Sequence, residues 1–292
     1  MIKMILIIFA ITGVFLIDVS FWNYTPGRRM SITYYMLPLF IALILDIVFF
    51  DKGKKFTKRL RKYILYLIVF YVYINFYLVF ASRGALVAIF VCLLLCLISK
   101  IKTRIRKILC TIVGFSIIIV LYISMQNILM SINELLNSMN IYSVTLERTI
   151  ELFEEENVGN GRDGVYENAI NGIKEHPFLG NGIGDFDNKY QTYPHNVVLQ
   201  AWYEGGIINM IVILVPIIYS IYLMTFSNKI SNDNKYLLIL LFSISTVRLM
   251  ISYEYWKDNY FWIYMYITLM LWMGDEKLKN GNSNNTNIQE ST

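Results

Sequence analysis

Apolar residues run through this chain in long blocks, separated by short basic or polar stretches. A transmembrane helix needs roughly 20 apolar residues to cross about 30 Å of hydrocarbon, and a helix satisfies its own backbone hydrogen bonds, as the bilayer requires. Eight blocks approach that length: 4–17, 34–50, 63–81, 84–99, 108–124, 206–226, 236–252 and 259–273. The pattern predicts an all-α integral membrane protein with about eight transmembrane helices.

The composition supports this class. Of the 292 residues, 56% are apolar and only 16% are charged, and the mean hydropathy is +0.50. These values exclude an ordinary soluble domain. No small-residue cleavage site follows the first block, so we expect a retained transmembrane helix there and not a signal peptide. The cysteines (Cys92, Cys96 and Cys110) lie in or beside apolar blocks, so no disulfide framework is expected to brace the polar segments.

Two short loops fix the expected orientation. Residues 52–62 contain seven Lys or Arg, and residues 100–107 contain five. Basic loops stay in the cytoplasm during membrane insertion, so both loops should face inward. The polar segment 126–205 has the opposite balance, with twelve Asp or Glu against four Lys or Arg. We therefore expect this segment outside the cytoplasmic membrane, and both chain termini in the cytoplasm.

This topology divides the chain into four parts. Residues 1–124 form an N-terminal bundle of five transmembrane helices, and residues 125–205 form a large, helical extracytoplasmic loop before the sixth. Residues 206–273 supply three more transmembrane helices. Residues 274–292 are rich in Asn, Ser and Thr, which predicts a disordered cytoplasmic tail. The outer loop is the largest polar segment, so the chemistry of the protein is expected there.

Apolar positions within the outer loop recur at helical spacing. Residues 126–153 predict amphipathic helices that lie on the bilayer or over the bundle. Residues 163–176 predict another helix, which Pro177 ends. Arg162 then lies at a helix N-terminus, where its charge and the free backbone N–H groups attract the same anion. The alternative is an exposed arginine that pairs with one of the nearby acidic residues.

Both histidines of the chain lie in residues 175–196 of the outer loop. His176 is followed by Pro177 and is expected at a helix end. His195 directly precedes an apolar helix, so an imidazole that titrates near neutral pH lies where the loop meets the membrane. This position favours a role in chemistry, with a purely structural role as the alternative.

Three alternating glycines lie between the histidines, at Gly180, Gly182 and Gly184. A dinucleotide-binding loop has a strand before such glycines and a helix after them. Neither is expected here, so we predict no nucleotide site. The glycines would instead let the backbone approach a bulky ligand.

Several of these residues form one ordered set. It consists of Ser82-Arg83-Gly84, then Arg162, Tyr166 and Ala169, then His176-Pro177-Phe178 with Gly180, Gly182, Gly184 and Phe186, then His195-Asn196 with Leu199, and finally Glu204 with Gly206. The set resembles the motifs of the O-antigen ligase and O-antigen or capsular polysaccharide polymerase family of membrane glycosyltransferases. The resemblance covers roughly residues 82–206. The chain has fewer predicted spans than the ten to twelve or more that are usual in the family.

The resemblance implies that a glycan moves from a polyprenyl-diphosphate carrier to a sugar hydroxyl on the outer face of the membrane. It implies an inverting enzyme with no metal and no cofactor, and its key arginines and histidine correspond to Arg83, Arg162 and His195. Guanidinium groups match diphosphate oxygens and keep their charge, and His195 suits removal of the acceptor proton. The implied partners are the lipid-linked oligosaccharide, the glycan acceptor, the bilayer and other polysaccharide assembly proteins, with no nucleic acid.

Further contacts with substrate are expected at Arg248, Tyr166, Gly182, Gly184, Asn196 and Glu204. Arg248 lies about 12 residues past the cytoplasmic start of its span, hence roughly 18 Å up at ~1.5 Å per residue. Arginines inside a membrane are costly and usually face a cavity. The alternative for Arg248 is an ion pair with Glu254 or Asp258 near the outer edge.

Several functions remain open at this point. A polymerase is preferred to a ligase that acts on lipid A core. The high content of Ile, Asn, Lys and Tyr is typical of proteins from AT-rich genomes, and many bacteria with such genomes lack lipopolysaccharide. A ligase would have no acceptor in them. A flippase or transporter for lipid-linked glycans is a second class. Such a protein should carry polar groups at the bilayer midplane and matching repeats, whereas the candidate residues of this chain are expected at the outer interface. An inactive accessory subunit of a polysaccharide assembly complex is the third.

Overall fold

The computed structural model describes residues 34–49 with gaps, Leu60, 83–123, 125–139, 147, 150–151, 162–227 and 230–289. Throughout these residues the chain forms helices, turns and loops, and no strand, so the all-α prediction is confirmed for them. Two of the eight predicted spans, 4–17 and 63–81, lie outside the described residues. The count of eight spans therefore stays a prediction.

Helices occur in the apolar blocks that the structure describes and also in the polar segment 125–205. They are α4 (Arg83–Lys100), α5 (Arg104–Ile123), α6 (Met125–Ser138), α8 (Arg162–Glu175), α9 (Asp185–Tyr190), α10 (Val197–Thr225), α11 (Asn232–Leu241), the π-helical turn η2 (Phe242–Thr246), α12 (Val247–Leu249), the 3-10 turn η3 (Tyr255–Lys257) and α13 (Asn259–Gln289). Within the described part of the chain, α10 alone is long and apolar enough to cross a membrane.

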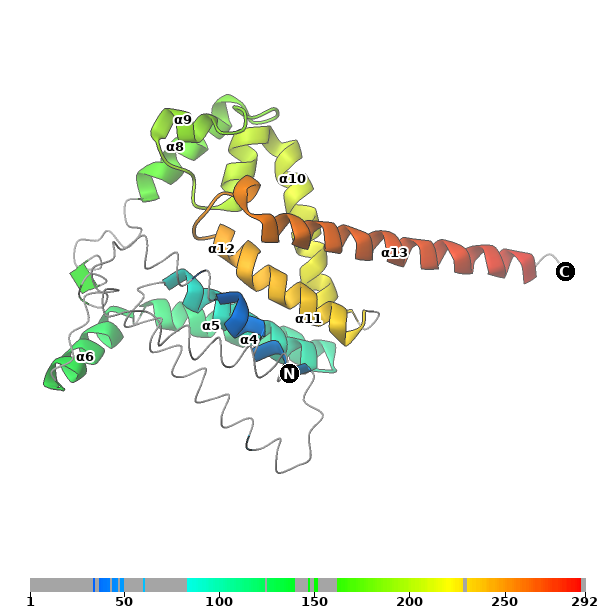
Figure 1. Ribbon diagram of the computed structural model, residues 1–292, viewed down its shortest axis with the longest axis horizontal. Coiled ribbons are helices and arrows are strands. Elements are labelled where there is room, and N and C mark those ends of the chain that lie inside the picture. The colour runs from blue at the N-terminus through cyan, green and yellow to red at the C-terminus, as the bar shows by residue number, and fades with distance from the viewer. Residues whose placement is uncertain are drawn as a thin grey trace.

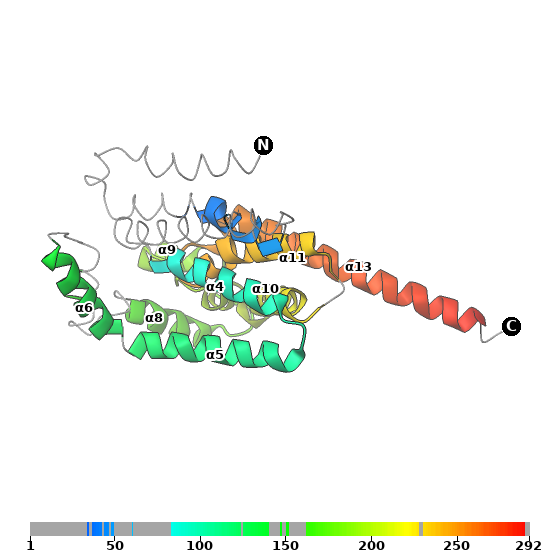
Figure 2. The same ribbon diagram turned by 90° about the horizontal axis from the view of Figure 1, so that it is seen from below.

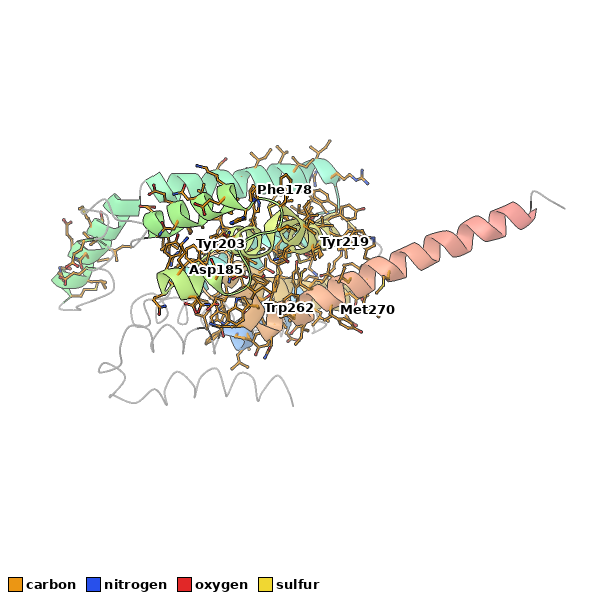
Figure 3. All side chains as sticks on the ribbon, turned by 90° about the horizontal axis from the view of Figure 1, so that it is seen from above. Phe178, Asp185, Tyr203, Tyr219, Trp262 and Met270 are labelled. Carbon is orange, nitrogen blue, oxygen red and sulfur yellow. The ribbon has the colours of Figure 1, made fainter. Side chains whose placement is uncertain are left out.

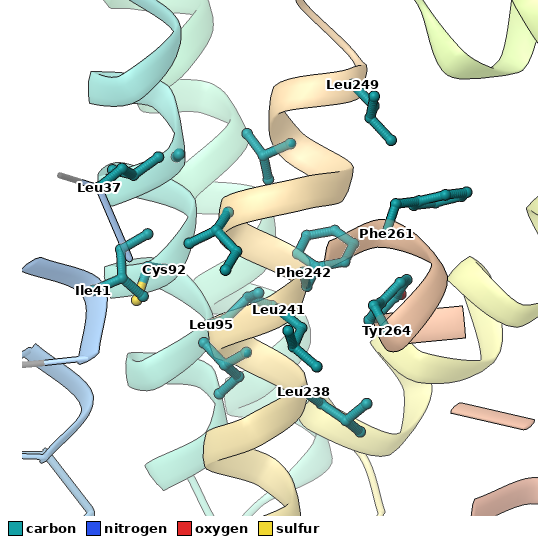
Figure 4. Close-up of a cluster of buried hydrophobic side chains, with 14 of the residues drawn as sticks. Leu37, Ile41, Cys92, Leu95, Leu238, Leu241, Phe242, Leu249, Phe261 and Tyr264 are labelled. Atoms are coloured by element: carbon teal, nitrogen blue, oxygen red, sulfur yellow. The ribbon is translucent and has the colours of Figure 1, made fainter. Parts of the chain in front are cut away.

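The core lies between α4, α13 and the helical run from α11 through η2 to α12 (Figure 4). Buried side chains from all of these helices, and from the first described segment, meet there: Leu37, Ile41, Cys92, Leu95, Leu238, Leu241, Phe242, Leu249, Phe261 and Tyr264. Ala85 and Ala88 are fully buried on α4. Helix α4 packs against α12, and small residues let two helices approach closely.

The first turns of α5 and the last turn of α10 lie together. Lys107 is buried, and its ammonium group donates a hydrogen bond to the carbonyl of Thr225. A cation is favourable at a helix C-terminus because the last carbonyls are unpaired and partly negative. The basic loop 100–107 and the C-terminal end of α10 therefore share one end of the protein, and the orientation of this end in the membrane stays a prediction.

Helices α5 and α6 lie at the edge of the structure (Figures 1 and 2). Large apolar side chains along α5 are exposed, including Ile105, Ile112 and Val113. Helix α13 begins in the core and then projects away from the other helices to its end at Gln289 (Figure 1). This helix continues past residue 274, where the sequence predicts a disordered tail. Asn, Ser and Gly are weak helix formers, so the composition gave no signal for this extension.

Candidate active site

A short loop after α8 supports the centre of the site. We call residues 176–184 the glycine strap. The amides of Asn181 and Gly182 donate to the carbonyls of Tyr203 and Glu204 at 2.8 and 2.9 Å, and the amide of Ile207 donates to the carbonyl of Pro177 at 2.9 Å. The strap therefore provides hydrogen-bond partners for backbone groups of α10 that a break in the helix would leave unpaired.

That break lies at Gly205 and Gly206. Gly206 has φ +67° and ψ −169°, a conformation that is open to glycine and strained for other residues. A Cβ on Gly206 would collide with the carbonyl of Phe178, and a Cβ on Gly180 would lie 2.5 Å from the backbone of Glu204. Glycine is therefore required on both sides of this contact. Figure 1 shows the resulting bend, with the first turns of α10 beside α8 and α9.

A small second core attaches α8 and α9 to the first turns of α10. It contains the buried residues Ala169, Ile173, Phe186 and Tyr203. The Tyr203 ring lies against Gly172, where a Cβ would collide with it, and its hydroxyl donates to the Asp185 carboxylate at 2.7 Å (Figure 3). The expectation that no helix follows the alternating glycines is wrong, because α9 begins directly after Gly184. No strand precedes them in the described residues, so the context of a dinucleotide loop is still lacking.

His195 has an unusual backbone and an unpaired side chain. Its φ is +53°, in the left-handed region that few non-glycine residues adopt. Its Nδ1 atom is buried without a hydrogen-bond partner. Its ring packs on Tyr193, with the ring centroids 4.1 Å apart. Strained backbone and unpaired buried polar atoms cost free energy and are concentrated at functional sites.

Arg162 acts electrostatically on this imidazole. Burial, and secondly the positive charge of Arg162, lower the pKa of His195 from its ordinary 6.5 to about 4. Arg162 is the first residue of α8, as the sequence predicts. The charge of Arg162 therefore acts on His195, which links two of the three predicted catalytic residues, and the His195 imidazole is neutral at pH 7.

Arg248 lies at the end of α12 between two aromatic rings. Its guanidinium carbon is 4.6 Å from the centroid of the Tyr34 ring and 4.1 Å from that of Tyr253. One of its terminal nitrogens (Nη1) is 4.0 Å from Asp258, and its Nε is buried without a hydrogen-bond partner. The aromatic faces orient the guanidinium plane. The ion-pair alternative is therefore realised with Asp258, but at a distance that leaves hydrogen-bonding capacity unused.

Tyr34 connects Arg248 with the beginning of α4. A Cβ on Gly84 would collide with the Tyr34 hydroxyl and would lie 3.5 Å from Ile251. Gly84 directly follows Arg83, the first residue of α4. The backbone of the third predicted catalytic residue therefore lies beside the same tyrosine that covers Arg248.

The break divides α10 into a first arm, residues 197–204, and a second arm, residues 207–225. Glu204 is buried at the end of the first arm. Its Oε1 accepts a hydrogen bond from Gln200 Nε2 at 3.0 Å, whereas its Oε2 is buried without a partner. Burial, and secondly the negative charge of Glu204, raise the pKa of Tyr255. Tyr255 also accepts a hydrogen bond from Asn209 at 3.2 Å. Glu204 thus connects the glycine strap to the loop that follows Arg248.

The remaining predicted substrate residues have different surroundings. Gly182 and Gly184 have φ of +103° and +79°, and a Cβ on either would meet no atom within 4 Å. Asn196 caps α10, since its Oδ1 accepts from the amides of Val198 and Leu199 at 3.0 and 3.1 Å. Tyr166 is partly buried, one turn after Arg162 on α8. The open space at the two glycines is compatible with a ligand, whereas Asn196 has a structural use.

Sequence reasoning missed the tyrosines of this site. Tyr34, Tyr193 and Tyr253 each contact a predicted site residue or its neighbour, yet the sequence holds 22 tyrosines. Tyr253 has a φ of +79°, which marks it only once the backbone is seen. Among the described residues, no group of three His, Cys, Asp or Glu side chains is placed to bind a metal ion.

Fold and site together define a class: a protein whose described residues are helical, with tyrosine rings packed on Arg248 and His195 and a break within a membrane-length helix. The sequence model of the O-antigen ligase family matches residues 65–214, just over half of the 292 residues. The chain belongs to the O-antigen ligase family, which confirms the resemblance drawn from its motifs. Proteins of this family lie in the inner membrane and have a glycosyltransferase-like activity of the O-antigen ligase or polymerase type. No curated protein and no solved structure matches the chain.

Proposed function

We propose that this protein moves an oligosaccharide from a polyprenyl-diphosphate carrier to a sugar hydroxyl at the outer face of the cytoplasmic membrane. Within this reaction we favour a polysaccharide polymerase. The observation that carries the proposal has two parts: the charge of Arg162 acts on His195, and a hydrogen bond between Tyr193 and Ser252 links the loop of His195 to that of Arg248. Both His195 and Arg248 have a buried nitrogen without a hydrogen-bond partner. Unpaired buried groups are costly unless a ligand supplies their partners.

The donor diphosphate is the anion that these cations fit. Arg248 is oriented by two tyrosine rings, and a planar guanidinium can bind two phosphate oxygens at once. Arg162 adds charge at the first turn of α8, where free backbone N–H groups also attract anions. Arg83, at the start of α4, is the third proposed cation. Their charge stabilises the diphosphate as negative charge develops on it.

The proposed reaction is a single inverting displacement. The acceptor hydroxyl oxygen forms a bond to the anomeric carbon, and the bond from that carbon to the diphosphate oxygen breaks. The diphosphate leaves with the electron pair of that bond, and the neutral imidazole of His195 takes the acceptor proton. Bound diphosphate would offset the charge of Arg162, so the pKa of His195 should rise when donor binds. The base is then better matched to proton transfer near neutral pH.

This displacement requires no metal ion, because arginine supplies the charge that a divalent cation supplies in other glycosyltransferases. Gly182 and Gly184 border open space and are proposed to allow the sugar and carrier head group to pass. Tyr166, Asn196 and Glu204 remain proposed substrate contacts. A flippase is less well supported, because the candidate residues are expected at the outer interface and a transporter should carry its polar groups at the bilayer midplane.

The test uses purified protein in nanodiscs with lipid-linked repeat units, without nucleotide sugar and with EDTA present. We expect a ladder of longer lipid-linked products. Arg83→Ala, Arg162→Ala and His195→Ala should each abolish the ladder while the protein still accumulates in the membrane. Lys174→Ala, on the exposed last turn of α8, is the matched control and should leave the ladder intact. Normal product length from all three variants, or strict dependence on a divalent ion, would contradict the proposal.

A further inference from the structure

Three large apolar side chains of the glycine strap point away from the protein. Phe178 is 70% exposed, Leu179 81% and Ile183 73%. The backbone that carries them is fixed by hydrogen bonds from Gly180 to His176, from Asn181 to Tyr203 and from Ile207 to Pro177. These backbone hydrogen bonds hold the loop in a conformation that keeps the three side chains exposed. Apolar groups clustered in this way normally mark a surface that another apolar phase covers.

The strap lies beside the start of the long second arm of α10, residues 207–225. The carbonyl of Phe178 abuts Gly206, and Pro177 accepts the amide of Ile207. Directly beyond this contact, α10 exposes a run of apolar side chains: Ile208, Ile211, Val212 and Val215. If this arm crosses the membrane, these side chains contact lipid. The apolar side chains of the strap therefore continue the lipid-facing surface of α10 at the level where the helix enters the bilayer.

The chemistry of the strap does not suit a sugar or a charged partner. Residues 177–184 contain no charged side chain. Their one polar side chain, Asn181, already donates to the carbonyls of Gly172 and Tyr203, both at 3.1 Å. A glycan would require hydrogen-bonding groups at this surface. The acyl-chain region of a bilayer requires no hydrogen-bonding groups at the surface that contacts it.

We infer that Phe178, Leu179 and Ile183 insert into the outer leaflet of the membrane. Through the hydrogen bonds to Tyr203 and Glu204, an inserted strap fixes the first arm of α10, and with it His195, at a constant depth. The strap is then an interfacial membrane contact, separate from the residues that bind substrate. This inference uses the membrane orientation of α10 and requires no catalytic activity.

The experiment measures the depth of spin labels in lipid vesicles. Leu179→Cys is labelled in a protein whose Cys92, Cys96 and Cys110 are alanine, and paramagnetic relaxation by oxygen and by a water-soluble nickel chelate is compared. Asn188→Cys is the matched control, because it is exposed on α9 and polar. We expect the label at position 179 to relax several-fold more with oxygen than with nickel, and the label at position 188 to show the reverse.

If the background lacking all cysteines folds poorly, Cys110→Ala alone suffices, because Cys92 and Cys96 are buried. Ile183→Cys provides a second position, and agreement between positions 179 and 183 supports insertion. Nickel accessibility at position 179 equal to that at 188 would overturn the inference. Protection that appears only after lipid-linked donor is added would also overturn it, in favour of contact with the carrier tail. All these results are independent of whether transfer occurs.

Discussion

The hydroxyl of Tyr193 lies 3.3 Å from the hydroxyl of Ser252, across 59 residues of sequence. Tyr193 packs its ring on His195, and the amide of Ser252 donates to the carbonyl of Arg248 at 2.7 Å. This hydrogen bond therefore joins the loop of the proposed base to the loop of a proposed diphosphate ligand. Transfer requires a fixed separation between the base that deprotonates the acceptor and the group that binds the donor diphosphate.

Tyr193→Phe should separate the two contributions of this residue. The variant keeps the ring against His195 and loses the hydrogen bond, worth about 1 kcal/mol. We expect the turnover rate to fall roughly 5-fold with little change in folding, as measured by the rate of product elongation and the thermal unfolding midpoint. Tyr193→Ala should lose far more activity, because it also removes the ring. Equal activity of the wild type and both variants would show that the link has no role.

The titration of His195 can be observed directly by NMR on histidine-labelled protein. The chain has two histidines, so His176→Gln leaves His195 as the sole signal. Its pKa should lie near 4, well below 6.5, because the imidazole is buried and the positive charge of Arg162 acts on it. Arg162→Gln removes the nearby positive charge and should raise that pKa, whereas Lys174→Gln should not. A pKa near 6.5 in the wild type would contradict the electrostatic coupling.

The same shift sets a dependence of stability on pH. The unfolded chain binds a proton at His195 below about 6.5, and the folded protein does so only near pH 4. The contribution of His195 to the free energy of unfolding is therefore complete above pH 6.5 and is lost as the pH falls toward 4. His195→Gln should remove this part of the pH dependence.

Arg248→Lys tests whether the planar guanidinium matters beyond its charge. Lysine keeps the charge but cannot stack its head group between Tyr34 and Tyr253 or donate two parallel hydrogen bonds. We expect KM for lipid-linked donor to rise about 10-fold or more, in line with the ~1.5–3 kcal/mol of a charged hydrogen bond. An unchanged KM for the donor would indicate that Arg248 serves only its pair with Asp258.

Gly206→Ala should destabilise the protein strongly. The new methyl group would collide with the carbonyl of Phe178, and the positive φ is strained for alanine, at a cost of about 1–3 kcal/mol for the backbone alone. Gly164→Ala is the control, since that glycine lies on α8 with open space around it. The control should gain up to roughly 1 kcal/mol of stability. Thermal unfolding in detergent distinguishes the two, and a tolerated Gly206→Ala would refute the tight contact.

Asn196→Asp and Asn196→Ala distinguish capping from substrate binding. Aspartate keeps the oxygen that accepts from Val198 and Leu199, whereas alanine loses it, at a cost of about 1 kcal/mol. If capping is the only role, Asn196→Asp should retain both the unfolding midpoint and transfer activity. Loss of activity at normal stability would reveal a contact between the amide of Asn196 and substrate.

Much of this protein follows from the order of its residues. Apolar blocks near the length of the hydrocarbon predicted helices that the structure contains, and Pro177 correctly marked the end of α8, which is described to Glu175. The prediction that an apolar helix follows directly after the His195-Asn196 pair is confirmed by α10, which begins at Val197. These signals are local: each depends on the solubility of one segment or on a backbone restriction of one residue. The family could also be identified from the sequence, because its motifs follow one another in a fixed order along the chain.

Other features depended on contacts between distant segments. The alternating glycines suggested space for a ligand, but Gly180 is required by the nearby backbone of α10, while Gly182 and Gly184 face open space. Nothing in the sequence singled out Tyr34 and Tyr253, whose rings enclose Arg248. The low pKa of His195 likewise arises from burial and from Arg162, which precedes it by 33 positions. Polarity and chain flexibility are properties of single residues and are determined by sequence, whereas burial, stacking and electric field depend on which distant atoms folding brings together.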